Sequence, residues 1–202
     1  MSTLAPTRPQ TFPVLLVAAW FAAAYLLADA GAFVGTADEP PWRIGLAILV
    51  PIGAAGLALW LSPTARTWAR SLDLQLLITM QAWRYGGFAF IALWAAGLLP
   101  AGFALPAGLG DIAIATAAPF VARHTAAHGP TRVFYAWTAL GILDLVVAVT
   151  LGILNSPGPF GLLAGDPTTA VVDTFPVALI PAFGVPLMIV LHLLSLARVR
   201  ST

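Results

Sequence analysis

Among the polar side chains inside the apolar stretches of this 202-residue sequence, five could do chemistry. They are Gln81, Arg84, Asp111, Asp144 and His192. A guanidinium can hold a carboxylate through two hydrogen bonds, and a carboxyl group can give up or accept a proton. These five residues are therefore our candidates for a site that binds a small ligand or a proton.

The rise of an α-helix places three of these charges at a similar depth. Asp111 and Asp144 each lie twelve residues from an arginine at a predicted helix end, which is about 18 Å at 1.5 Å per residue. Arg84 lies fourteen residues from such an arginine, or about 21 Å. His192 is six residues from Arg198, so it lies only about 9 Å from that end.

Charges at this depth need partners, because each unpaired one costs roughly 2.5–3.5 kcal/mol near the middle of a membrane helix. We therefore expect Arg84 to face Asp144 or Asp111, with Gln81 on the same helix face completing the hydrogen bonds. One interpretation is a salt-bridge network that fixes how the helices pack. The other is a site for a substrate or proton. One Arg with two Asp has a formal charge of −1, and this surplus favours the second interpretation.

Small residues flank the charged ones on the same predicted helix faces. Gly87 follows Arg84 by three positions, Gly108 precedes Asp111 by three, and Gly141 precedes Asp144 by three. Because small residues let membrane helices approach closely, we expect these three helices to pack around the charges. The sequence from 106 to 110, Pro-Ala-Gly-Leu-Gly, further suggests that the helix carrying Asp111 begins as an unwound stretch.

Metal and cofactor sites find no support in the sequence. The chain has no Cys, which excludes thiolate ligands and disulfides. His192 has no second histidine at its depth, so we expect a hydrogen-bonded or interfacial side chain without haem or metal. His124 and His128 are four residues apart, and we interpret them as a solvated loop pair rather than metal ligands. We therefore predict no metal and no cofactor.

Composition identifies the elements that must position the site. Hydrophobic residues make up 60% of the chain and charged residues 8%, whereas soluble proteins have about 45–50% and 25%. This excludes a soluble enzyme, a disordered protein and a nucleic-acid partner. We predict an all-α membrane protein, with residues 1–202 forming one transmembrane domain. A span needs roughly 20 apolar residues. The six predicted spans are at about 12–34, 42–61, 74–99, 104–122, 132–154 and 176–197.

The arginines predict the orientation of the chain. If both termini are cytoplasmic, seven arginines lie on the cytoplasmic side of the six spans, and only Arg43 lies outside. The use of Arg without any Lys suggests a bacterial source, and hence a bacterial inner membrane. An alternative at the N-terminus is a cleaved signal peptide, because an apolar run ends in Ala-Asp-Ala at 28–30.

Two connecting segments carry their own signals. Trp68, between arginines in the segment 63–73, indicates an interfacial anchor. Asp166 followed by Pro167 predicts the N-cap of a short surface helix at 167–174.

The sequence thus favours a membrane protein that binds or passes a small solute or a proton. Its partners would be the lipid bilayer, that ligand, and either further copies of the chain or a larger membrane complex. An accessory subunit of such a complex is one alternative. A second is an intramembrane enzyme acting on a lipid or isoprenoid, although no motif supplies a nucleophile, so the sequence leans away from catalysis.

Overall fold

The computed structural model describes residues 11–36 and 38–199, and in this part of the chain all regular structure is helical. Five helical stretches are long and apolar enough to cross a membrane. They are α2 (Trp42–Leu61), Leu74–Ala95, α6 (Ala101–His128), α7 (Arg132–Leu154) and Ile180–Val199. This confirms the predicted all-helical class, and the five apolar stretches are compatible with a membrane protein. Arg8 and Arg200, used above for the orientation, lie outside the described residues.

The first predicted span ends earlier than expected. Helix α1 covers Thr11–Asp29, and its apolar part from Pro13 is shorter than the five long stretches. Gly31 adopts a φ of 69° just after the helix, and the N–H of Ala32 donates to the carbonyl of Leu27 at 2.9 Å. A glycine in the left-handed region with this backward bond is a common way to end a helix. The prediction of helix up to residue 34 was therefore wrong.

The third predicted span consists of two α-helical pieces with a 3-10 segment between them. Helix α4 (Leu74–Met80) begins at Asp73, whose carboxylate accepts hydrogen bonds from the N–H groups of Gln75 and Leu76. A 3-10 segment, η1 (Gln81–Gly87), follows, and α5 (Phe88–Ala95) completes the span. One regular helix was expected here, and no residue pattern indicates the change in winding at Gln81.

The unwound start predicted for the fourth span is absent. Helix α6 is continuous from Ala101 to His128 and contains Pro106 and Pro119. A side chain at Gly108 would collide with Ile91 at 2.6 Å, so this glycine serves close helix packing rather than unwinding. The helix also extends beyond the predicted end at residue 122.

The last span begins with a π-helical turn, η3 (Ile180–Gly184), which leads into α8 (Val185–Val199). Pro181 and Pro186 lie at this change in winding, as expected for residues that interrupt regular helical hydrogen bonds. The segment between α7 and this span contains only a short 3-10 helix, η2 (Ala170–Asp173). The predicted surface helix at 167–174 is therefore wrong, and Asp166 does not cap η2, which follows Thr169.

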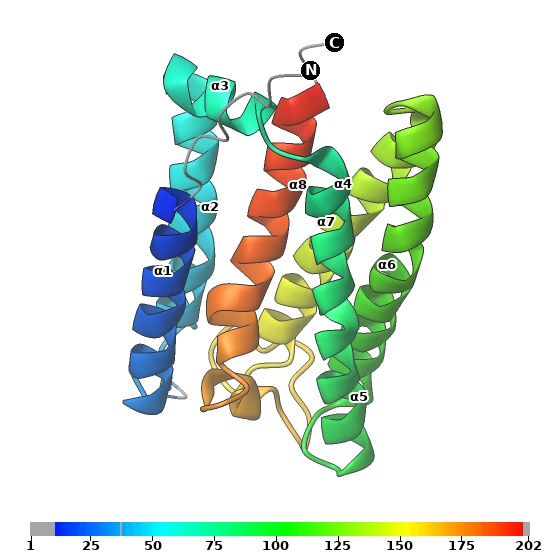
Figure 1. Ribbon diagram of the computed structural model, residues 1–202. Coiled ribbons are helices and arrows are strands. Elements are labelled where there is room, and N and C mark those ends of the chain that lie inside the picture. Colours follow the sequence, from blue (N-terminus) through cyan, green and yellow to red (C-terminus); the bar gives the residue numbers. More distant parts are fainter. Residues whose placement is uncertain (1–10, 37, 200–202) are drawn as a thin grey trace, which may run out of the picture.

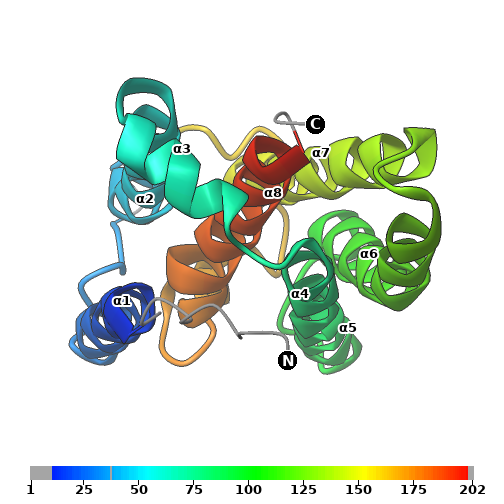
Figure 2. The ribbon, with the colours of Figure 1, turned by 45° about the horizontal axis from the view of Figure 1, so that its top comes forward.

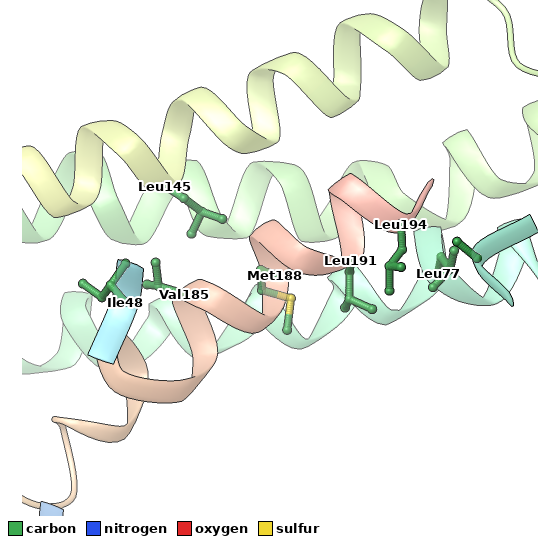
Figure 3. Packing of buried hydrophobic residues seen from close by; sticks show 8 residues of the cluster. Ile48, Leu77, Leu145, Val185, Met188, Leu191 and Leu194 are labelled. Carbon is green, nitrogen blue, oxygen red and sulfur yellow. The ribbon is translucent and has the colours of Figure 1, made fainter. Parts of the chain in front are cut away.

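The helices are arranged around α8. Figures 1 and 2 show α1 and α2 on one side of α8 and α4 to α7 on the other, while α3 (Pro63–Arg70) crosses one end of the bundle. Figure 3 shows part of the apolar core, in which side chains spaced along α8 contact residues of its neighbours. Val185, Met188, Leu191 and Leu194 come from α8, and they pack with Ile48, Leu77 and Leu145.

Candidate functional site

Arg84 lies at the centre of the candidate site and is 3% exposed. Its Nε donates to Oδ1 of Asp111 at 2.7 Å, and its Nη2 donates to Oδ2 of Asp144. The third nitrogen, Nη1, donates to the backbone carbonyl of Gly141 at 2.9 Å. The predicted pairing of Arg84 is therefore confirmed, and it involves both aspartates rather than one of them.

Each of these side chains is positioned by a different helix. In η1 the residues three apart lie in line, and the buried residues of this segment are Gln81, Arg84 and Gly87. Asp111 lies on α6 and Asp144 on α7, which run in opposite directions through the bundle (Figure 1). Arg84 thus joins three neighbouring spans through charge-assisted hydrogen bonds, which are stronger than neutral ones.

Three glycines leave the space that the site side chains occupy. A Cβ atom on Gly110 would lie 1.7 Å from Oδ1 of Asp144, and one on Gly87 would lie 2.6 Å from Cβ of Asp111. A Cβ atom on Gly141 would lie 2.5 Å from Nε2 of His192 and 3.3 Å from Nη1 of Arg84. The prediction that small residues let the helices close around the charges is confirmed by these approaches.

His192 belongs to the same site. Its side chain is fully buried beside Gly141 and Arg84, and its ring lies edge-on to Trp137 with centroids 5.1 Å apart. Side chains on a helix point toward its N-terminus, which directs His192 away from the Arg198 end of α8 and toward the charges. Neither ring nitrogen has a hydrogen-bond partner among the described residues. The expectation of a hydrogen-bonded or interfacial histidine was therefore wrong.

Gln81 does not complete the hydrogen bonding of Arg84 as predicted. Its Nε2 donates to the backbone carbonyl of Met188 at 3.0 Å, and its Oε1 has no partner in the described part of the chain. Thr138, buried one turn before Gly141, likewise has a hydroxyl oxygen without a described partner. Sequence reasoning missed Thr138, because a threonine in a helix most often returns its hydroxyl to its own backbone.

A cavity of about 80 Å³ reaches the site from the end of the bundle that holds the 155–179 segment. Asp111 lines its inner part, and Ser156, Thr169 and Asp173 line it at the loop segment. Most other lining side chains are apolar and come from α2, α7 and η3 with α8. The cavity connects two carboxyl groups, Asp111 and Asp173, that the sequence places 62 residues apart.

Asp173 lines the cavity at the loop segment, outside the spans, and the pKa of its carboxyl group is shifted. Burial without a compensating charge raises the pKa of its carboxyl from 3.8 to about 6. Sequence reasoning placed Asp173 in a connecting loop and did not include it in the site. No local pattern marks it, because its burial depends on how the loop folds over α2 and α7.

The other histidines do not form a metal site. His124 and His128 stack in the last turn of α6 with centroids 4.5 Å apart, so they are helical rather than in a loop. His124 contacts the Thr131 hydroxyl at 3.1 Å. Over residues 11–36 and 38–199, no group of three or more His, Asp or Glu side chains is placed to hold a metal ion.

Residues 41–200 match the model of a family described as a domain of unknown function, DUF8737. The chain belongs to this family. The matched DUF8737 region begins just before α2 and contains every residue of the Arg84 site and its cavity, whereas α1 precedes it. No curated protein and no solved structure matched the chain.

Proposed function

We propose that this DUF8737 protein exchanges a proton between water at one membrane face and the Arg84–Asp111–Asp144 site. The observation that carries the proposal is the cavity that leads from Asp173 to Asp111. When Arg84, Asp111 and Asp144 are all ionised, the site has a formal charge of −1. Arg84 pairs with both carboxylates but neutralises only one negative charge. A proton on one carboxyl group removes that surplus charge, which is costly inside a membrane.

The size of the cavity favours a proton over a larger solute. Ligand pockets are commonly about 300–1,000 Å³, whereas this cavity is about 80 Å³. A single water needs roughly 10–15 Å³ of such space, so the volume has room for several waters. The side chains that could hydrogen-bond them are Asp111, Ser156, Thr169 and Asp173. This argument weighs against an isoprenoid substrate and supports a proton carried along waters.

Asp111 is the group that we propose to take up the proton. It lines the cavity and accepts a hydrogen bond from Nε of Arg84. Asp144 does not line the cavity, so we assign it to holding Arg84 in place. Asp173, at the other end of the cavity, would deliver or withdraw the proton near neutral pH, because its pKa lies at about 6.

The topology that we propose has six spans, with both termini in the cytoplasm of a bacterium and residues 1–202 in one domain. Helix α1 is nineteen residues long and rises about 28 Å, close to the thickness of a bilayer core. Trp20 on α1 packs edge-on against Phe183 of η3 with ring centroids 4.8 Å apart, which supports a place for α1 within the bundle.

Infrared difference spectroscopy on the protein in lipid nanodiscs tests the proton site. A pH step should reveal a buried carboxyl stretch that is absent from Asp111→Asn and still present in Asp166→Asn, a matched change on the exposed loop. A folded Asp111→Asn protein with an unchanged carboxyl signal would show that the charges only fix the helix packing.

A further inference from the structure

A second hollow lies at the opposite end of the bundle from the cavity described above. It measures about 370 Å³ and lies between α2, α3 and α8. Arg66 and Arg70 of α3 line one side, and apolar side chains that include Leu59, Leu193 and Leu196 line the others. We call it the α3 groove, and it is independent of the proposed proton site.

The two arginines of the α3 groove have no acidic partner. In the described part of the chain neither Arg66 nor Arg70 forms an ion pair. Asp73, the nearest acidic residue in the sequence, is held by the first N–H groups of α4. Two positive charges that line one hollow without a counter-charge are complementary to an anion.

Arg66 is held in place, whereas Arg70 is free to bind. Nη1 of Arg66 donates to the carbonyl groups of Trp60 and Leu59 at 2.6 and 3.3 Å, so it closes the C-terminal end of α2. Arg70 is exposed and has no hydrogen-bond partner among the described residues. The two are four residues apart and therefore lie on one face of α3.

The position of α3 indicates which anion the groove receives. Figures 1 and 2 show α3 lying across the end of α2, beside the end of α8. A short helix with arginines on one face at the end of a membrane bundle lies at the level of lipid headgroups. The apolar walls of the α3 groove then extend from the headgroup level along α2 and α8, where an acyl chain runs.

We propose that the α3 groove binds one anionic phospholipid. Arg70 and the remaining N–H groups of Arg66 hold the headgroup phosphate, and an acyl chain lies against Leu193 and Leu196. A free phosphate would leave the apolar walls empty, and a zwitterionic lipid would place its own cation beside the two arginines. The combination of charge and apolar surface therefore selects a lipid with a net negative headgroup.

Native mass spectrometry of the full-length protein in detergent tests this proposal through titration with phosphatidylglycerol and with phosphatidylcholine. We expect one phosphatidylglycerol to bind preferentially and Arg70→Gln to weaken it about fivefold, the effect of removing one cation near a headgroup. Arg132→Gln is the matched control, since Arg132 is also exposed, also lacks a described partner and starts α7 at the same end.

A second pair of variants tests the apolar part of the groove. Gly56 lines it, and a side chain there would meet no atom within 4 Å, so Gly56→Leu fills the groove without disturbing α2. We expect this variant to weaken phosphatidylglycerol binding at least as much as Arg70→Gln. Gly53→Leu, on the same helix with equally open surroundings and outside the groove, should bind normally.

Four results would overturn the proposal. Equal binding of the two lipids would remove the role of charge, and equal loss with Arg70→Gln and Arg132→Gln would indicate unspecific attraction. Full competition by inorganic phosphate would identify a free-anion site. A change from dimer to monomer with Gly56→Leu would identify the groove as a contact between two copies of the chain.

Discussion

All three guanidinium nitrogens of Arg84 have acceptors, and two of these acceptors are carboxylates on different helices. Removing either aspartate therefore leaves the arginine one carboxylate, whereas removing the arginine leaves two carboxylates without a cation. At the scale of single residues, the stability of the site thus depends more on Arg84 than on either aspartate.

We therefore expect Arg84→Gln to destabilise the protein by about 3–5 kcal/mol, the usual cost of breaking a buried ion pair. Asp144→Asn and Asp111→Asn should each be milder, because the other aspartate still pairs with Arg84. Thermal unfolding in detergent measures the three variants together. A melting temperature of Arg84→Gln equal to that of Arg132→Gln would contradict this ranking.

The contact between Gly110 and Asp144 predicts a second loss of stability. In Gly110→Ala the new Cβ atom, built in its ideal position, would lie 1.7 Å from Oδ1 of Asp144 and so overlap the carboxylate. Overpacking of this kind costs about 1–3 kcal/mol. Gly53→Ala, with no atom within 4 Å, should instead leave stability unchanged or raise it by about 0.5–1 kcal/mol. Thermal unfolding that ranks the two variants in the reverse order would refute the close approach.

Asp173 predicts a dependence of stability on pH. Its folded pKa of about 6 exceeds its usual value of 3.8, so the folded state binds more protons between these values. Stability should therefore fall as pH rises from about 4 to 6, and Asp173→Asn should remove this fall. We expect the variant to be about 1–3 kcal/mol more stable at pH 8, nearer the lower value because the side chain is partly exposed, and unchanged at pH 4. Melting curves that keep the parent pH dependence would contradict this.

At the scale of the helices, the sequence alone predicted two spans to the residue and misjudged the others at their ends. Trp42–Leu61 and Arg132–Leu154 agree with the predicted bounds, and Pro41 and Thr131 stand immediately before their first residues. Other differences lie at glycines. Gly31 ends α1, whereas Gly108 and Gly110, read as a loosened backbone, lie within a regular helix against their neighbours.

The candidate site was predictable in membership but not in detail. The cost of charge in a membrane predicted that Arg84, Asp111 and Asp144 meet. The unpartnered nitrogens of His192 and the contribution of Asp173 depend on how α8 and the 155–179 segment fold over other helices. Such long-range packing has no local pattern in a single sequence.

The junction between α3 and α4 offers a test at this scale. The Asp73 carboxylate accepts from the N–H of Gln75 at 2.8 Å and from that of Leu76 at 3.4 Å. Asp73→Ala should lower stability by about 0.5–2 kcal/mol, whereas Asp73→Asn should retain most of it, since asparagine caps helices equally well. Chemical or thermal unfolding measures both, and equal losses in the two variants would mean that the cap is not the cause.

At the scale of the whole molecule, the two hollows lie at opposite ends of one bundle. The cavity at the 155–179 segment has two carboxyl groups among apolar lining side chains, whereas the α3 groove has two arginines among them. The proposed orientation, which rests on arginines that include Arg66 and Arg70, places the α3 end in the cytoplasm.

Site-directed labelling tests this topology, and the absence of Cys makes the experiment direct. Single cysteines at positions 38 and 166 should react with an impermeant thiol reagent added outside intact cells. A cysteine at position 127 should react only after the cells are opened. Labelling of position 127 alone from outside would reverse the orientation, and labelling of all three would contradict a span between them.

The winding of η1 has a mechanical consequence. A 3-10 helix advances about 2.0 Å per residue and turns about 120°, whereas an α-helix advances about 1.5 Å and turns about 100°. Rewinding the seven residues of η1 as α-helix would shorten the span by about 3.5 Å. It would also rotate Arg84 by about 60° relative to Gln81. With Gln81 held at the Met188 carbonyl, this rotation would move the guanidinium of Arg84 out of its present contacts. The 3-10 winding of η1 is therefore what allows Gln81 and Arg84 to keep their partners at the same time.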